Sequence, residues 1–434
     1  MNSYKTEDLV RKFKQNASSV VIFGCGLEGK LALHALQLHD VKVNYFIDSK
    51  KKLQDKYHLG IKTISPEELA QSTPDAHIFI AHGWLNVAIE LLNKLNFKNI
   101  YNIVELLKSI DYSKEIHSDK LNLHHESLKL ERRIKSFNYR TAAELKKTEI
   151  KGKTKLNGTE KSNDTLVVSH IDIVVTERCS MKCRDCANLM QFYHKPKNAD
   201  INLLFKSMDR FMDCVDQLYE FRVIGGDPFM NKEMYKVINK AVEYKNVESV
   251  VIYTNAKIIP RGGNLECLKN KKVRLQITDY GSSAAANTWN YIGTRHDEIV
   301  KLLASNNIKF VSERVTKWDD IGSLKFIQET PKQLQKKFND CCANDLFSLL
   351  HGVLYKCPVS AHGTNLKAFS YDSKYDGVDL ADDKISIKNL RKKLIDFYYN
   401  NNYLTACSYC KGRGYGEGEV NAAIQAPKAL PLFS

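Results

Sequence analysis

Strand-like and helix-like segments alternate along the chain from residue 166 to about residue 335. Each short apolar run is followed by a longer stretch in which apolar residues recur every three or four positions. Such alternation favours a parallel sheet, because a helix must return the chain to the edge where the next strand begins. We therefore expect a full or partial β/α barrel with its chemistry at the carboxyl ends of the strands. The expected strands are His170–Thr176, Glu220–Ile224, Ser249–Tyr253, Arg274–Thr278 and Lys309–Val311, with helices around Leu203–Asp213 and Lys232–Tyr244.

The chain has 434 residues, which is more than one hydrophobic core usually organises. Residues 1–112 show their own strand–helix alternation, and we expect a small Rossmann-like domain there. Residues 113–165 are rich in Lys, Glu, Ser and Asn, which indicates a linker that contains one helix. Residues 336–434 are richer in cysteine and in turn residues than residues 166–335, and they are expected to form a further domain. The predicted fold class is therefore α/β.

A glycine-rich turn follows the first apolar strand of residues 1–112. Gly24, Gly26 and Gly29 open a helix, and Asp48 ends the next strand. Glycines at this spacing let the backbone approach a ligand, the helix N-terminus attracts phosphate, and the acidic residue can bond a ribose hydroxyl. We expect a nucleotide or nucleotide-sugar site. NAD is a weaker alternative because the domain is short, and a Rossmann-like scaffold without a ligand is another.

Charge and cysteine content limit the possible partners and the cell compartment of the protein. The formal net charge of +15 favours anionic partners, although a lysine-rich solvated surface explains it equally well. The sequence has no run of about 18 uncharged apolar residues and its first residues are polar, which predicts a cytoplasmic protein with no membrane partner. Eleven cysteines in a reducing compartment favour metal ligation over disulfides.

Three cysteines follow the strand that ends at Thr176: Cys179, Cys183 and Cys186. Structural metal sites are normally closed by four protein ligands. Three thiolates can instead hold a [4Fe–4S] cluster and leave one iron open for a substrate or cofactor. A zinc site with His194 as the fourth ligand is the alternative.

The spacing of these cysteines resembles the signature of the radical SAM superfamily. The resemblance implies a partial (β/α)6 barrel, a [4Fe–4S] cluster on the three cysteines, and S-adenosyl-L-methionine (SAM) bound at the open iron. Reduction would then split a C–S bond of SAM and yield a 5′-deoxyadenosyl radical. The same resemblance assigns cofactor contacts to later strand ends, at Gly225, Gly226, Asp227 and Pro228, at Thr254 and Asn255, and at Asp279.

Two positions depart from the family pattern. Asp227 stands where relatives usually carry glutamate, which is a conservative change. Asp185 stands just before the third cysteine, where many relatives carry an aromatic residue near the adenine of SAM. The resemblance therefore assigns no adenine contact at that position.

Five cysteines lie beyond residue 336. Between Cys342 and Cys357 come nine residues, a glycine and four more residues, which is similar to the auxiliary-cluster domains of radical SAM enzymes, and most to the short Twitch form rather than the longer SPASM form. Cys407 and Cys410 complete four thiolates that can bind a second [4Fe–4S] cluster or zinc. Cys342 is preferred to Cys341 on spacing. Buried free thiols are the remaining alternative.

These features predict a radical SAM enzyme that abstracts hydrogen from a sugar, a cyclitol or a nucleotide-linked sugar, leading to dehydrogenation, dehydration or epimerisation. Its partners would be a small substrate, phosphorylated or nucleotide-linked, and an external one-electron donor such as flavodoxin or ferredoxin. Two alternatives stay open: an enzyme that modifies peptides or proteins, and a non-catalytic iron–sulfur regulator bound to nucleic acid. Nucleic acid is disfavoured because no helix-turn-helix or aromatic-rich basic groove stands out.

Overall fold

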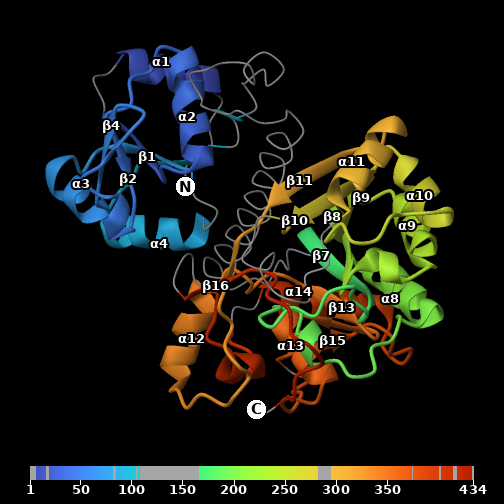
Figure 1. Ribbon diagram of the computed structural model, residues 1–434. Coiled ribbons are helices and arrows are strands. Elements are labelled where there is room, and N and C mark those ends of the chain that lie inside the picture. Colours follow the sequence, from blue (N-terminus) through green and yellow to red (C-terminus); the bar gives the residue numbers. More distant parts are fainter. Residues whose placement is uncertain are drawn as a thin grey trace. The chain divides into compact units, whose positions relative to one another are not determined.

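The computed structural model describes residues 6–15, 19–81, 85–103, 106–107, 166–281, 295–373, 375–399, 402–413 and 418–432. They belong to two compact units, Met1–Glu160 and Lys161–Ser434 (Figure 1). The linker expected at residues 113–165, with its helix, lies outside the described residues. Both units are α/β, as predicted.

The N-terminal unit contains a six-stranded sheet in the order β3-β4-β2-β1-β5-β6. All its strands are parallel except β3, which forms a hairpin with β4. Strand β1 therefore lies between β2 and β5, which is the switch point of a Rossmann-type sheet. The elements are α1 (Thr6–Gln15), β1 (Val20–Phe23), α2 (Leu27–Leu38), β2 (Tyr45–Ile47), η1 (Lys51–Leu53), β3 (Tyr57–His58), β4 (Ile61–Ile64), α3 (Pro66–Ser72), β5 (His77–Ile80), α4 (Leu85–Lys94) and β6 (Ile100–Asn102).

Both faces of this sheet are buried, which explains the apolar runs in its sequence. Successive residues of β1 enter different cores: Ile22 packs in one cluster with Leu31 and Leu36 of α2. Val21 packs in the other cluster, which includes Leu69 of α3 and Leu92 of α4. Helices therefore cover both faces, as in a doubly wound fold.

The second unit contains an eight-stranded sheet in the order β11-β10-β9-β8-β7-β13-β14-β15. Strands β7 to β11 are parallel neighbours, and each of the five contains or overlaps the strand expected there. Figure 1 shows α8 to α11 on one side of these strands, the arrangement of a partial barrel. The elements are β7 (Val167–Thr176), η3 (Met190–Phe192), α8 (Ile201–Cys214), β8 (Gln217–Gly225), η4 (Pro228–Met230), α9 (Met234–Glu243), β9 (Val247–Thr254), α10 (Gly263–Glu266), η5 (Cys267–Lys269), β10 (Val273–Asp279), α11 (His296–Ser305) and β11 (Phe310–Arg314).

The sixth parallel strand comes from the C-terminal part of the chain. Strand β13 pairs in parallel with the free edge of β7, and β14 and β15 continue the sheet in antiparallel fashion. The cysteine-rich part of the chain is thus joined to the barrel strands through one sheet. Its elements are β12 (Lys317–Asp319), α12 (Pro331–Asp340), β13 (Ser348–Leu350), β14 (Val353–Tyr355), α13 (Pro358–Asn365), β15 (Gly377–Asp379), α14 (Ile387–Tyr399), η7 (Thr405–Tyr409) and β16 (Glu419–Asn421).

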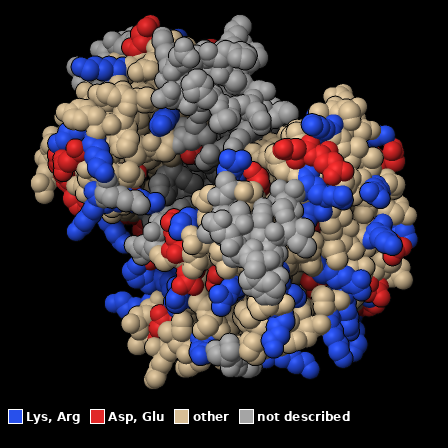
Figure 2. Space-filling model, in the orientation of Figure 1, with Lys and Arg blue, Asp and Glu red and all other residues tan. Residues whose placement is uncertain are grey.

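The surface carries both kinds of charge. Figure 2 shows Lys and Arg side chains spread over the visible face, with Asp and Glu among them. On this face, the positive charge is dispersed rather than gathered in one patch. Among the described residues, no helix combines the length and the apolar character needed to cross a bilayer.

Candidate functional site

The three cysteines after β7 lie together at the carboxyl end of the barrel strands. Cys179, Cys183 and Cys186 share one apolar cluster with Tyr280, which follows β10, and with Ala423 near the C-terminus. Burial raises the pKa of each thiol, to about 12 for Cys183. Nearby acidic groups add to the effect: for Cys179 these are Asp227 and the other two thiols. As thiolates, the three groups need a bound cation to offset burial and mutual repulsion.

Each of these sulfur atoms faces at least one N–H donor. The Met181 backbone donates to Cys179 Sγ over 3.4 Å, and Gln425 Nε2 donates to Cys183 Sγ over 3.2 Å. Backbone N–H groups of residues 188–190 lie near the Cys186 thiol and lower its pKa, against the larger effect of burial. Donors directed at sulfur stabilise negative charge there, as metal-bound thiolates require.

The two glycines at the end of β8 bring that strand against the cysteine loop. A Cβ at Gly226 would lie 2.2 Å from the Arg178 carbonyl oxygen and 2.7 Å from Cys179 Cβ. Only glycine therefore allows this approach. The Gly225 carbonyl accepts a bond of 3.3 Å from Asn188, two residues beyond Cys186. These glycines were expected to let a ligand approach the backbone. In the structure they allow the cysteine loop to pack closely against the end of β8.

Asp227 ties the ends of β8 and β9 together. It is fully buried, and its carboxylate accepts hydrogen bonds from Thr254 Oγ1 at 2.8 Å, Asn255 N at 3.1 Å and Phe229 N at 3.0 Å. Pro228 begins the short helix η4 directly after it. The Asp227 side chain therefore points into the protein, and the aspartate acts as a brace between two strand ends.

Asn255 reaches from the end of β9 to the cysteine loop. Its Nδ2 lies 3.6 Å from Cys179 Sγ and 3.2 Å from the Ser180 hydroxyl. At the next strand end, Asp279 accepts from Gly281 N at 2.8 Å and from Arg314 Nε at 3.1 Å. The strand-end residues picked out from the sequence therefore surround one edge of the sheet, with Asn255 in direct contact with the loop.

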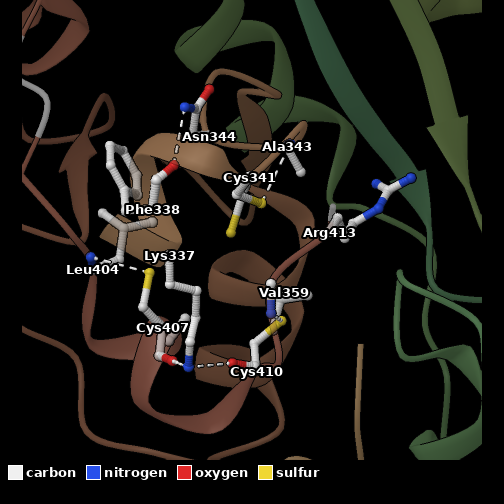
Figure 3. A pocket seen from close by; sticks show the side chains of 13 residues that line it. Lys337, Phe338, Cys341, Ala343, Asn344, Val359, Leu404, Cys407, Cys410 and Arg413 are labelled. Carbon is white, nitrogen blue, oxygen red and sulfur yellow. Dashed lines mark hydrogen bonds between the residues drawn. The ribbon is translucent and has the colours of Figure 1, made fainter. Parts of the chain in front are cut away.

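Four thiols surround a second space in the C-terminal region, and they differ in one member from the expected set. The pocket is lined by Cys341, Cys357, Cys407 and Cys410, and Figure 3 shows the sulfurs of Cys341, Cys407 and Cys410 around it. Cys342 does not line it. The structure therefore places Cys341 with the other three thiols, in place of the Cys342 that spacing favoured.

The local backbone explains why Cys341 and not Cys342 lines the pocket. Cys341 ends α12 in an extended conformation, with φ −80° and ψ 127°, so successive side chains point in opposite directions. Cys341 faces the other thiols, whereas the Cys342 thiol lies 3.8 Å from an Asp319 carboxylate oxygen. Arg413 donates to the same carboxylate over 3.2 Å. The Cys342 thiol thus lies beside the Asp319 carboxylate and not among the residues that line the pocket.

The four pocket thiols also accept backbone N–H groups. The donors are Ala343 for Cys341, Ser360 for Cys357, Leu404 for Cys407 and Gly412 for Cys410, at 3.3–3.5 Å. Burial raises the pKa of the Cys407 thiol to about 12 and of the Cys410 thiol to about 11. Lys337 Nζ holds the loop between these two cysteines by bonding both of their carbonyl oxygens, over 3.1 and 2.9 Å.

The donor sets suit iron–sulfur clusters. Among the described residues, no three His, Cys, Asp or Glu side chains are placed to hold a single metal ion. The thiolates of a cubane cluster bind different irons and stand farther apart than ligands of one ion. Three thiols at one site and four at the other, each with an N–H donor on sulfur, fit an open and a closed cluster respectively. His194, considered as a zinc ligand, is exposed.

The N-terminal glycine turn adopts the expected strand–turn–helix form. A Cβ at Gly29 would lie 1.9 Å from the Gly24 carbonyl oxygen, so glycine is required where the helix meets the turn. Gly26 is the N-cap of α2 and uses no side chain to cap it. Asp48 ends up beside the turn: its carboxylate accepts from Lys50 N at 2.9 Å and lies 3.8 Å from the Cys25 thiol.

A buried polar network joins the cysteine loop to helix α13, and sequence reasoning missed it. Glu177, two residues before Cys179, accepts bonds from Asn365 at 2.7 Å and His351 at 2.8 Å. Asn365 also donates to the Tyr193 hydroxyl over 2.9 Å. Gln425 was missed as well, and no sequence signal pointed to it. Cys341 was weighed against Cys342 in the sequence, although Cys342 was preferred.

No family model matches the chain. Part of it is similar in sequence to GTP 3′,8-cyclases. It shares 32% identity over 96 residues with the protein of Campylobacter lari, covering 21% of this chain and 29% of the relative. With the protein of Sulfurovum sp. it shares 29% identity over 97 residues, covering 22% and 29%. The matched segment thus spans 29% of the length of each of these curated relatives.

Two solved structures align with more of the chain. BtrN in complex with AdoMet and 2-DOIA aligns with 61% of this chain and 98% of its own, at 14% identity and a TM-score of 0.39. The structure of anSMEcpe with bound AdoMet and the Cp18Cys peptide aligns with 61% and 92%, at 14% identity and a TM-score of 0.37.

Proposed function

We propose that this chain, a member of the radical SAM superfamily to which the GTP 3′,8-cyclases belong, is an enzyme that removes hydrogen from a small hydroxylated substrate. A [4Fe–4S] cluster with SAM supplies the 5′-deoxyadenosyl radical for this chemistry. Cys179, Cys183 and Cys186 would hold the cluster. An external one-electron donor such as flavodoxin or ferredoxin would reduce it.

The observation that carries this proposal is the contact between the cysteine loop and two other strand ends. Gly226 packs on the backbone at Arg178 and Cys179, and Asn255 reaches the Cys179 sulfur. An open iron held by this loop would therefore face the ends of β8 and β9. We assign SAM to that edge, with the Gly225–Pro228 segment, Thr254, Asn255 and Asp279 around it.

The C-terminal thiols would hold a second [4Fe–4S] cluster. Cys341, Cys357, Cys407 and Cys410 supply four ligands, which leaves no iron open for substrate. Full ligation suits an electron acceptor for a substrate radical, and so favours two-electron dehydrogenation over epimerisation. Lys337 and the four backbone donors would stabilise the charge of this cluster.

The substrate class proposed is a sugar or cyclitol, free or linked to a nucleotide. The strand order of the N-terminal unit and the Gly24–Gly29 turn beside Asp48 support a nucleotide-sugar site. The GTP 3′,8-cyclases act, by their name, on a nucleotide. Asp48 retains lone pairs that can accept from a ribose hydroxyl.

Anaerobic reconstitution tests the proposal. The wild-type chain should bind about eight irons and cleave SAM to 5′-deoxyadenosine once reduced. Cys183→Ala should bind about four and lose SAM cleavage, while Cys214→Ala, a buried thiol outside both sets, should retain both properties. Failure of the iron-loaded, reduced wild type to cleave SAM would refute the proposed chemistry. Deuterium transfer from labelled nucleotide-sugars into 5′-deoxyadenosine then tests the substrate class.

A further inference from the structure

The C-terminal tail lies against the middle of the cysteine loop. Strand β16 pairs with β12, and the chain then runs antiparallel to residues 182–184. Arg184 N donates to the Ile424 carbonyl over 2.8 Å, and Ala426 N donates to the Lys182 carbonyl over 2.7 Å. Residues 424–426 therefore form a short strand-like contact with a loop that lies about 240 residues earlier in the chain.

The side chain of Gln425 lies within this contact and bonds both the loop backbone and a cysteine. Lys182 N lies 2.8 Å from Gln425 Oε1, and Gln425 Nε2 lies 3.2 Å from Cys183 Sγ and 2.6 Å from the Ala423 carbonyl. A backbone N–H can only donate and a carbonyl can only accept. These two partners fix the orientation of the amide, so the group that faces the sulfur is an N–H donor.

A donor on a cluster sulfur has a defined electrostatic effect. Adding an electron makes the cluster and its thiolates more negative, and an N–H dipole stabilises the more negative state. Hydrogen bonds to sulfur are among the factors that set the potential of an iron–sulfur cluster. Gln425 is the side-chain donor on Cys183, whereas Cys179 faces the Met181 backbone N–H and, at 3.6 Å, the Asn255 side-chain amide. A substitution at position 425 can therefore remove this donor selectively.

We infer that Gln425 is a positioning residue that tunes the cysteine-loop cluster: its amide raises the reduction potential and holds Cys183 in place. This inference rests on the proposed function only in that the loop binds a cluster. The tail would thereby make reduction by the external donor easier. A shortened or displaced tail would leave the cluster harder to reduce, even with all three cysteines present.

Reduction of the full-length, anaerobically reconstituted protein can be followed by electron paramagnetic resonance at set potentials. The change that SAM causes in the spectrum identifies the loop cluster. Gln425→Glu keeps the size and the acceptor for Lys182 but loses the donor, and Gln425→Met loses both polar groups. Both should shift the potential to more negative values and lower the ratio of reduced to oxidised cluster about tenfold at a fixed potential.

The control is Asn421→Leu, an amide of the same tail that bonds exposed Lys317 and not a cysteine. It should leave the potential unchanged. Wild-type potentials in both Gln425 variants at full iron content would overturn the inference.

A measurement on the wild type covers the case in which the variants lose iron. With glutamine side-chain amides labelled with ¹⁵N, the reduced loop cluster should show a nitrogen hyperfine coupling, and its absence would overturn the inference. If no loop cluster assembles in the wild type, the proposed function itself fails. If the cluster assembles and SAM is cleaved but neither effect appears, only the role of Gln425 fails.

Discussion

Nδ1 of His362 lies 2.9 Å from the Tyr193 hydroxyl, although the two residues are 169 positions apart in the chain. Tyr193 follows the cysteine loop, and His362 lies on α13, which begins directly after Cys357. Both side chains are buried. Asn365 donates to both the Tyr193 hydroxyl and the Glu177 carboxylate. One hydrogen-bond network therefore connects the segments that carry the two sets of cysteines.

Replacing Tyr193 by phenylalanine should destabilise the second unit. The change leaves the buried Nδ1 of His362 without its partner and removes one of the two bonds of the Asn365 amide, which costs about 1–3 kcal/mol. Denaturant unfolding of the reconstituted protein measures it. The matched control is Tyr371→Phe, at an exposed tyrosine of the same unit. A Tyr193→Phe protein as stable as the control would show that the network contributes nothing to stability.

The stability of the second unit should fall as the pH drops below about 6.5. Burial lowers the pKa of His362 to about 4, while Glu177 opposes this and His351 adds to it. Between about pH 6.5 and pH 4, the unfolded chain therefore binds a proton that the folded chain does not, so acid favours unfolding. The contribution is about 1.4 kcal/mol per pH unit inside that window, and about 3 kcal/mol in total.

Unfolding free energies measured at several pH values test this linkage. His362→Gln should flatten the dependence between about pH 6.5 and pH 5. His194→Gln, at an exposed histidine, should leave the slope as in the wild type. An unchanged slope in His362→Gln would exclude His362 as the source.

The adjacent residues Cys341 and Cys342 should behave differently when each is replaced by alanine. Cys341→Ala should lower the iron content from about eight to about four, because its sulfur faces the other three thiols. Cys342→Ala should retain about eight, since its thiol faces Asp319 outside the pocket. Iron analysis and the visible absorbance of the reconstituted proteins measure both. The reverse result would restore the choice made on spacing.

Gly226→Ala should abolish SAM cleavage. The added Cβ would overlap the Arg178 carbonyl, forcing β8 and the cysteine loop apart at a cost of about 1–3 kcal/mol. Ser305→Ala is the control, since this exposed side chain at the end of α11 bonds the Leu302 carbonyl and lies outside the proposed site. Product analysis by chromatography compares the two proteins. Wild-type cleavage by Gly226→Ala would show that this contact is not required.

Much of the fold could be predicted because its signals are local. Apolar runs flanked by helical periodicity identified the parallel strands: Ser249–Tyr253 lies within β9, and the other four expected strands lie within or overlap β7, β8, β10 and β11. The β3–β4 hairpin and the position of β13 could not be predicted in this way. Both depend on which edge a short strand pairs with, and the strand's own residues do not encode that choice.

The sequence by itself determined that three cysteines follow the first barrel strand, since a spacing within eight residues is a property of the chain alone. Tertiary structure decided which other side chains meet them. Spacing favoured Cys342 over Cys341, but the extended backbone at Cys341 turns the two side chains in opposite directions and leaves Cys341 facing the other thiols. Gln425 reaches Cys183 only because β16 pairs with β12 and carries the tail back to the loop. Such contacts depend on how the whole unit packs, and the spacing of residues along a short segment of sequence does not encode that packing.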